Sequence, residues 1–169
     1  MDNLTTEYVS RGTTWLFITT LTYFFMNGAQ LFETAAVVPK FTASPPESFH
    51  LFKGPYGLDF KAFWITLHSV HEVTFILALV FCWKLDPIRN WLLLLFAIHV
   101  AVRVWTIAYF APNIIDFQHI ANTTNHGTDL LARASRWRIL NYVRVAMFMA
   151  VSLGLIPVCI RIAQLRFKV

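Results

Sequence analysis

Charged residues are scarce in this sequence. Only 14% of its 169 residues are Asp, Glu, Lys or Arg, whereas 57% are hydrophobic and 16% are aromatic. A soluble domain of this length cannot bury that much apolar surface, so the composition excludes an ordinary soluble globular protein. We predict an integral membrane protein whose main partner is the lipid bilayer.

The sequence also lacks a metal-type cysteine pair, a cleavable signal peptide and a basic cluster. The two cysteines, Cys82 and Cys159, form no metal-type pair, and we expect no disulfide between them. The first apolar run begins near Thr13 and is too long for a cleavable signal peptide. The net charge of +5 comes with no basic cluster, which excludes nucleic acid as a partner. Basic residues that flank membrane spans explain this excess.

Four apolar runs stand out, at about 13–38, 60–83, 90–111 and 137–160. At a rise of about 1.5 Å per residue, each can cross a hydrocarbon core of about 30 Å. Pro39 and Pro112 are expected to end the first and third spans, because proline has no amide hydrogen to donate. The predicted fold class is all-α: a single-domain transmembrane four-helix bundle with both termini on the same side.

Two long loops, residues 39–59 and 112–136, then lie on the side opposite the termini. Lysine and arginine are concentrated in shorter segments on the side of the termini, and such segments mark the cytoplasmic face. We therefore expect a multi-pass protein, placed in a bacterial inner membrane, with cytoplasmic termini. The long loops are expected to roof a polar pocket from the outer side.

Ionisable side chains interrupt the apolar spans. His68, His71 and Glu72 lie at helical spacing on one face of the second span. Such residues inside a membrane indicate a functional site by default. The other spans contribute further polar groups in the half nearer the long loops, namely Glu33, His99, Arg103, Asn141 and Arg144. We expect them to meet in one buried chamber with Glu–Arg contacts.

This set of side chains permits several kinds of chemistry. Imidazole and carboxylate groups suit iron, copper or zinc, and the candidate metal ligands are Glu33, His68, His71, Glu72 and His99. Without a metal, a histidine acts as general base and an arginine holds an oxyanion; the candidate catalytic residues are His68, His71, Arg103, Asn141 and Arg144. The His-x-x-His-Glu pattern matches neither the di-iron bundle motif nor the zincin helix motif. A proton or ion path, or a network that only fixes helix register, remains an alternative.

Short motifs in the first, third and fourth spans resemble a known family. They are Gly28 to Pro39 with Glu33 inside it, Phe110-Ala-Pro-Asn113, and Trp137-Arg-Ile-Leu-Asn141-Tyr-Val-Arg144. Together they are similar to the anthrone-oxygenase-like family of small four-helix membrane proteins. The resemblance implies the four-span layout, a last helix opened by tryptophan, asparagine and arginine, and oxidation of polycyclic anthrones without an obvious cofactor.

The leading functional prediction is a small membrane oxidoreductase or oxygenase. It would act on a lipophilic aromatic or quinone-like small molecule in an intramembrane His/Glu/Arg pocket. The alternative is a non-enzymatic membrane subunit, or a transporter of protons, ions or small molecules, that uses the same network. The expected cofactor is a transition metal (iron or copper) or none, and a homo-oligomer is compatible with the sequence.

Overall fold

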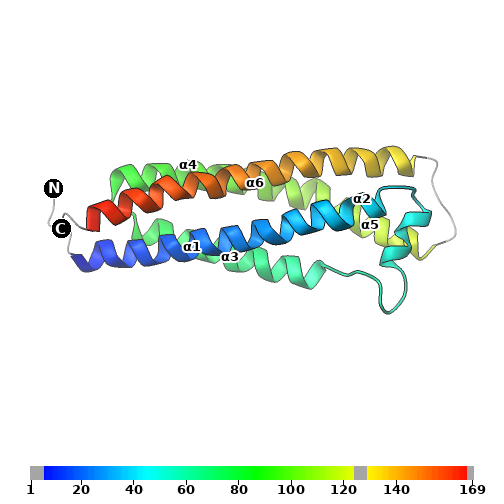
Figure 1. The fold of residues 1–169 in the computed structure, drawn as a ribbon, viewed down its shortest axis with the longest axis horizontal. Coiled ribbons are helices and arrows are strands. Elements are labelled where there is room, and N and C mark those ends of the chain that lie inside the picture. Colours follow the sequence, from blue (N-terminus) through cyan, green and yellow to red (C-terminus); the bar gives the residue numbers. More distant parts are fainter. Residues whose placement is uncertain (1–5, 124–128, 167–169) are drawn as a thin grey trace.

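The computed structural model describes residues 6–123 and 129–166, and this part of the chain contains helices and no strand (Figure 1). The long helices are α1 (Thr6–Phe32), α3 (Lys61–Phe81), α4 (Asp86–Trp105), α5 (Ala111–Ala121) and α6 (Leu130–Arg166). Shorter elements are two π-helical turns, Glu33–Val37 and Thr106–Phe110, the helix α2 (Val38–Phe41) and a 3₁₀ helix, Glu47–Phe52. The all-α prediction is confirmed.

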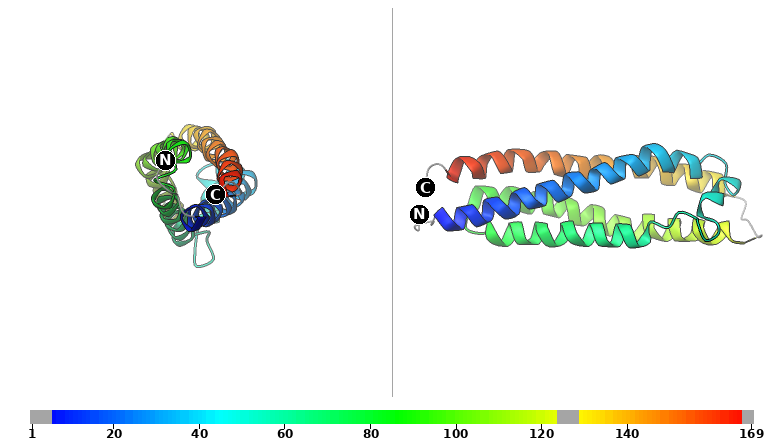
Figure 2. Two further views of the ribbon diagram at one scale, coloured as in Figure 1. Left: turned by 90° about the vertical axis from the view of Figure 1, so that its left-hand side faces the viewer. Right: turned by 60° about the horizontal axis from the view of Figure 1, so that its bottom comes forward.

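The long helices lie side by side as a bundle. α1 packs along α3 and α6, and α6 packs along α4, whereas contact between α3 and α4 is sparse. The end-on view in Figure 2 shows the helices arranged around a common axis. The start of α1 and the end of α6 lie at one end of the bundle (Figure 1), and residues 33–60, 106–123 and 129–137 lie at the opposite end, here called the loop end.

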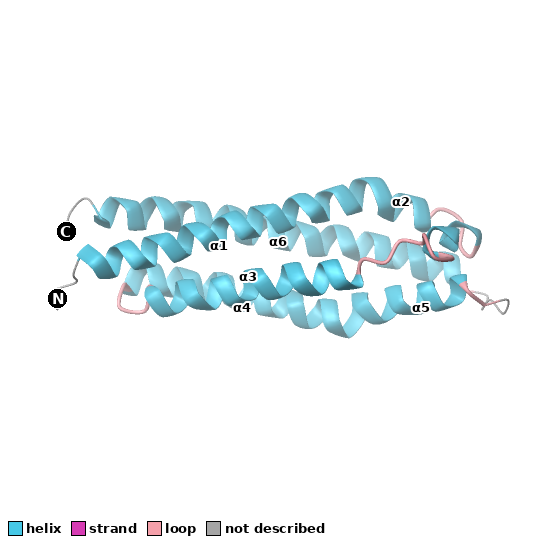
Figure 3. Cartoon of the chain, turned by 90° about the horizontal axis from the view of Figure 1, so that it is seen from below, coloured by secondary structure: helices cyan, strands magenta, loops and turns pink. Residues whose placement is uncertain are grey.

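Prolines do not end the helices where the sequence predicted. Figure 3 shows the chain passing without a loop from α1 into α2 and from α4 into α5. A π-helical turn directly precedes α2 and α5, and Pro39 and Pro112 each lie in the first turn of the α-helical segment that follows. At that position the missing amide hydrogen matters little, and a π turn relieves the clash with the preceding carbonyl. Residues 112–136 were predicted as a long loop with short helical pieces; in the described part of this segment, residues 112–121 and 130–136 belong to the longer helices α5 and α6.

Three helical stretches are long and apolar enough to cross a membrane: Lys61–Phe81, Asp86–Ala121 and Leu130–Leu165. They correspond to the second, third and fourth predicted spans. α1 has 27 residues but is rich in threonine. The hydroxyl groups of Thr13 and Thr20 each donate a hydrogen bond of 2.8 Å to the carbonyl four residues earlier, so they do not need water as a partner.

The loop end has an aromatic core of its own. The rings of Phe49 and Phe117 stack with centroids 5.0 Å apart, and those of Phe41 and Trp137 meet edge-on at 5.3 Å. These four residues come from the 3₁₀ helix, α5, α2 and α6, and all are buried. Phe41, Phe49 and Phe117 belong to the two segments that the sequence predicted as a roof, and their packed aromatic rings close the loop end.

Candidate functional site

The centre of the bundle contains a hydrogen-bonded pair of Tyr23 and His99. The Tyr23 hydroxyl lies 2.8 Å from His99 Nδ1, and the Tyr23 ring meets that of His71 edge-on at a centroid distance of 5.1 Å. The rings of His71 and His99 are 4.9 Å apart. All three side chains are at most 1% exposed, so α1, α3 and α4 hold them away from the surface.

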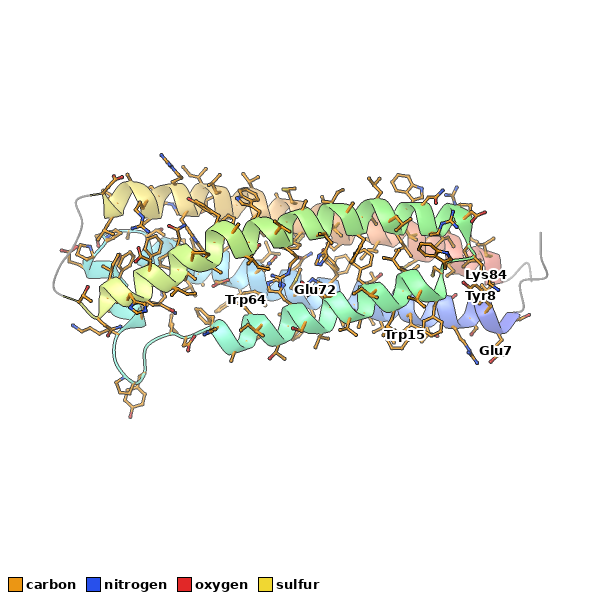
Figure 4. The ribbon with its side chains drawn as sticks, turned by 180° about the vertical axis from the view of Figure 1, so that it is seen from behind. Glu7, Tyr8, Trp15, Trp64, Glu72 and Lys84 are labelled. Atoms are coloured by element: carbon orange, nitrogen blue, oxygen red, sulfur yellow. The ribbon has the colours of Figure 1, made fainter. Side chains whose placement is uncertain are left out.

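An ion pair joins α3 to α4 beside this centre. Arg103 Nε donates to Glu72 Oε1, and the same oxygen lies 4.0 Å from His99 Nε2. The Glu72 side chain is 36% exposed and that of Arg103 18% exposed, so the pair reaches the outer surface between these two helices. Figure 4 shows Glu72 between the ribbons of α3 and α4, with Trp64 further toward the loop end. The predicted Glu–Arg contact is present in this pair.

A line of ring contacts leads from the centre toward the loop end. His68 lies 5.2 Å from His71, measured between ring centroids, and stacks on Trp64 at 5.4 Å. The Trp64 indole lies close enough to the carboxylate of Glu33, in the π-helical turn after α1, to act on it as a hydrogen-bond donor. The three predicted histidines therefore lie in one cluster that is linked to Glu33 through Trp64.

Arg144 of α6 lies in a neighbouring polar group. Its Nη2 donates to Asn141 Oδ1 at 2.6 Å, and Asn141 Nδ2 donates to Thr34 Oγ1 at 3.0 Å. The guanidinium lies 4.5 Å from the centroid of the Phe110 ring, in cation–π geometry. Arg144 acts electrostatically on Glu33, but no salt bridge joins the two in the part of the chain that the structure describes. The second expected Glu–Arg contact is therefore not formed.

Several buried polar atoms in this region have no hydrogen-bond partner. Within residues 6–123 and 129–166 they are Asn27 Oδ1, Gln30 Nε2 and Oε1, His68 Nδ1, His71 Nε2 and Arg144 Nε. Buried polar atoms are normally hydrogen-bonded, and exceptions often mark a binding or catalytic role. These atoms come from α1, α3 and α6.

The proposed metal ligands do not form a metal-binding arrangement. Among the described residues, no group of three or more His, Cys, Asp or Glu side chains could hold a metal ion. The donors instead have other partners: Glu72 is bound by Arg103, His99 by Tyr23, and Glu33 by Trp64. The prediction that Glu33, His68, His71, Glu72 and His99 form a metal site therefore has no support in the geometry.

Tyr23 and Gln30 were not among the predicted site residues. Tyr23 bonds directly to His99, and both amide atoms of the buried Gln30 lack partners. A signal for them exists in the sequence, because Tyr23, Gln30 and Glu33 fall at helical spacings on one face of the first helix. Tyr23 and Gln30 carry no charge, so the sequence indicates a site less strongly at these positions than at the neighbouring charged residues.

Two grooves indent the outer surface, and both are apolar. The larger, of about 870 Å³, lies between α1 and α3; its lining residues include Leu21, Phe25, Phe63 and Val70. The other, of about 530 Å³, lies between α1 and α6. Neither groove is lined by a predicted site residue. The polar side chains thus pack against one another rather than lining either hollow.

The fold and the site together define the class of protein. The chain is an all-α protein with three helices long and apolar enough to cross a membrane, and with a polar cluster buried between its helices. No family model, curated protein or solved structure matches it. The resemblance to the anthrone-oxygenase-like family therefore stays a prediction.

Proposed function

We propose that α1 is a further span, which makes the protein a four-span bundle with both termini in the cytoplasm. α1 exposes large apolar side chains along its length, such as Phe17, Leu21, Phe25 and Phe32. The other long helices expose similar faces, including Val73 and Val80 on α3 and in α6 the residues Ile139, Leu153 and Ile160. Outward apolar faces on every long helix are what contact with lipid requires.

The bilayer covers only part of the bundle in this proposal. α6 has 37 residues, and at about 1.5 Å per residue it is about 55 Å long, well beyond a hydrocarbon core of about 30 Å. Apart from Leu131 in its first turn, its exposed large apolar side chains extend from Ile139 to Ile160, which corresponds to about 32 Å by the same rise. The aromatic core of the loop end then lies outside the hydrocarbon, while Tyr23 and His99 lie within it.

For this bundle we propose a membrane oxidoreductase or oxygenase that acts on a lipophilic aromatic or quinone-like substrate. The observation that carries the proposal is the Glu72–Arg103 pair, which is partly exposed near the middle of α3 with His99 directly behind it. Charged groups at this depth are costly and usually functional. A substrate dissolved in the bilayer meets a hydrogen-bond donor and a base at this position.

The arrangement suits abstraction of a proton from a carbon or oxygen acid. Arg103 holds the substrate oxygen as it becomes anionic, and a histidine accepts the proton. His71 contacts its own backbone through Nδ1, 3.1 Å from the Leu67 carbonyl, so Nδ1 carries the hydrogen and Nε2 is free to accept one. With an anthrone, the resulting anion reacts with dioxygen. One oxygen atom becomes a second ring carbonyl at the former methylene carbon, and the other leaves as water with the two methylene hydrogens.

The alternative is a non-enzymatic subunit, or a transporter of protons, ions or small molecules. The line of groups from Glu33 through Trp64 and His68 favours a proton path on the loop-end side. On the other side of Tyr23 the interior consists largely of buried apolar residues, including Phe75, Leu92, Leu95, Val151 and Leu155. This apolar half favours a closed site over a path across the membrane.

Turnover measurements test the enzyme proposal. Purified protein in lipid nanodiscs is given anthrone or a short-chain quinol, and oxygen uptake and product absorbance are recorded. We expect protein-dependent turnover that falls at least 100-fold in His71→Gln, in line with the loss of a general base. Arg11→Gln, an exposed change far from the site, serves as control. No turnover, together with proton flux in liposomes, would replace the enzyme proposal by the transport alternative.

A further inference from the structure

Four unpartnered polar atoms of the loop-end half belong to three side chains that are at least nine-tenths buried. Gln30 is 1% exposed, His68 5% and Arg144 8%. Gln30 leaves both amide atoms without a partner, His68 leaves Nδ1, and Arg144 leaves Nε. A buried polar atom without a hydrogen bond costs about 1–3 kcal/mol. Several such atoms together indicate that something else bonds to them.

The three side chains lie on α1, α3 and α6, in the half of the bundle nearer the loop end. His68 feels the charge of Arg144, and its ring lies 6.1 Å from that of Phe148, one turn beyond Arg144 on α6. Gln30, near the end of α1, precedes Glu33 and Thr34 of the following π-helical turn by about one turn. Those two residues bond to Trp64 of α3 and to Asn141 of α6, so α1 is held between the two helices at this level.

We propose that Gln30, His68 and Arg144 hold a small cluster of water molecules that exchanges protons between Glu33 and the histidines. A water molecule donates two hydrogen bonds and accepts two, which suits a mixed set of amide, imidazole and guanidinium atoms. An anion fits less well, because the carboxylate of Glu33 already lies within electrostatic range of Arg144. The ligand is therefore neutral and small.

The cluster gives the histidines a proton supply from the loop end. Glu33 is half-buried, in the π-helical turn that faces that end of the bundle. A proton released by the Glu33 carboxyl group passes to a water, and a neighbouring water gives one of its own to His68 Nδ1. No electron moves in this step, and the return of a proton from His68 restores the starting state. The path stops at the apolar half beyond Phe75.

X-ray hydroxyl-radical footprinting of the full chain in nanodiscs tests this site, because radicals form where water is bound. His68 and His99 are a matched pair, since both are buried histidines but His99 is bonded to Tyr23. We expect His68 to be modified several-fold faster than His99. Gln30→Leu and Gln30→Met, which remove the amide atoms at similar volume, should lower the His68 rate several-fold without changing that of the exposed Tyr56.

Equal, low rates for His68 and His99 in the wild-type protein overturn the proposal whether or not the variants fold. A His68 rate that both Gln30 variants leave unchanged also overturns it. Protection of His68 by a co-purified amphiphile, seen by native mass spectrometry, shows that a lipid rather than water occupies the site. None of these readouts uses turnover, so the water cluster and the proposed enzyme function can fail separately.

Discussion

At the scale of single residues, Tyr23 contacts two of the three histidines and hydrogen-bonds to one of them. It hydrogen-bonds to His99 and packs edge-on against His71, and it is fully buried. A hydroxyl group in this position holds the His99 ring in one orientation and fixes which of its nitrogens faces Glu72. The chemistry proposed for the site therefore depends on a residue that carries no charge.

We predict that Tyr23→Phe keeps the fold but weakens the site. The ring still fills its place, while the loss of the hydroxyl leaves His99 Nδ1 unpaired at a cost of about 1–3 kcal/mol. Turnover in nanodiscs should fall at least 10-fold, and the melting temperature should drop by a few degrees. Tyr142→Phe, at a 46% exposed position, is the matched control. Unchanged turnover in Tyr23→Phe would remove the hydroxyl from the mechanism.

The Glu72–Arg103 pair gives a prediction about charge balance. Glu72→Gln leaves an arginine in the membrane interior without its partner, and a lone charge there costs about 2.5–3.5 kcal/mol or more. The double variant Glu72→Gln/Arg103→Gln removes both charges and should be more stable than Glu72→Gln alone. A double-mutant cycle on unfolding in mild detergent measures the difference. Additive effects would show that the two side chains do not interact.

At the scale of elements, the sequence supports a reliable prediction of helix and a poor one of helix ends. Long apolar runs identified the regions of α3, α4 and α6, and a short turn at residues 82–85 separates α3 from α4. The helix ends predicted at Pro39 and Pro112 were wrong, because a π-helical turn depends on packing and has no clear sequence pattern. The sequence placed the polar groups in the half nearer the long loops, and the three histidines do contact one another there. It gave no sign that Trp64 and Tyr23 contact them.

The π-helical turn before α5 predicts how the chain tolerates proline. Because that turn already accommodates Pro112, the change Pro112→Ala should alter the free energy of unfolding by less than about 1 kcal/mol. Ala101→Pro, inside α4 and well before the π turn, should cost about 3 kcal/mol or more. Equilibrium unfolding by helical circular dichroism compares the two. A large effect of Pro112→Ala would mean that the proline itself shapes the turn.

Two glycines of α1 differ in how closely a neighbour approaches. A Cβ added at Gly12 would lie 3.1 Å from the Phe81 carbonyl oxygen and 3.2 Å from Cys82 Sγ, whereas one at Gly28 meets nothing within 4 Å. Gly12→Leu should therefore push α1 away from α3 and destabilise the bundle by about 1–3 kcal/mol. Gly28→Leu, on the same helix, is the control and should change stability little. Equal losses would argue against close packing at Gly12.

At the scale of the whole molecule, the proposed four-span topology places the polar centre inside a bilayer. α3, α4 with α5, and α6 are apolar enough to span one. The position of α1 decides the rest, because α1 supplies Tyr23, Gln30 and the helix that leads to Glu33. If α1 lay on the membrane surface, the cluster seen between the helices could not form.

Cysteine accessibility in intact cells decides this topology. In a variant with Cys82→Ser and Cys159→Ser, both native thiols are gone, and single cysteines are then placed by Glu7→Cys at the start of α1 or by Tyr56→Cys, at a loop position that is 97% exposed. A membrane-impermeant maleimide should label the Tyr56 position from outside and the Glu7 position only after permeabilisation. Gln164→Cys, near the end of α6, should behave like the Glu7 position. Labelling of the Glu7 and Tyr56 positions from the same side would show that α1 does not cross the membrane. It would also overturn the proposal of an intramembrane site.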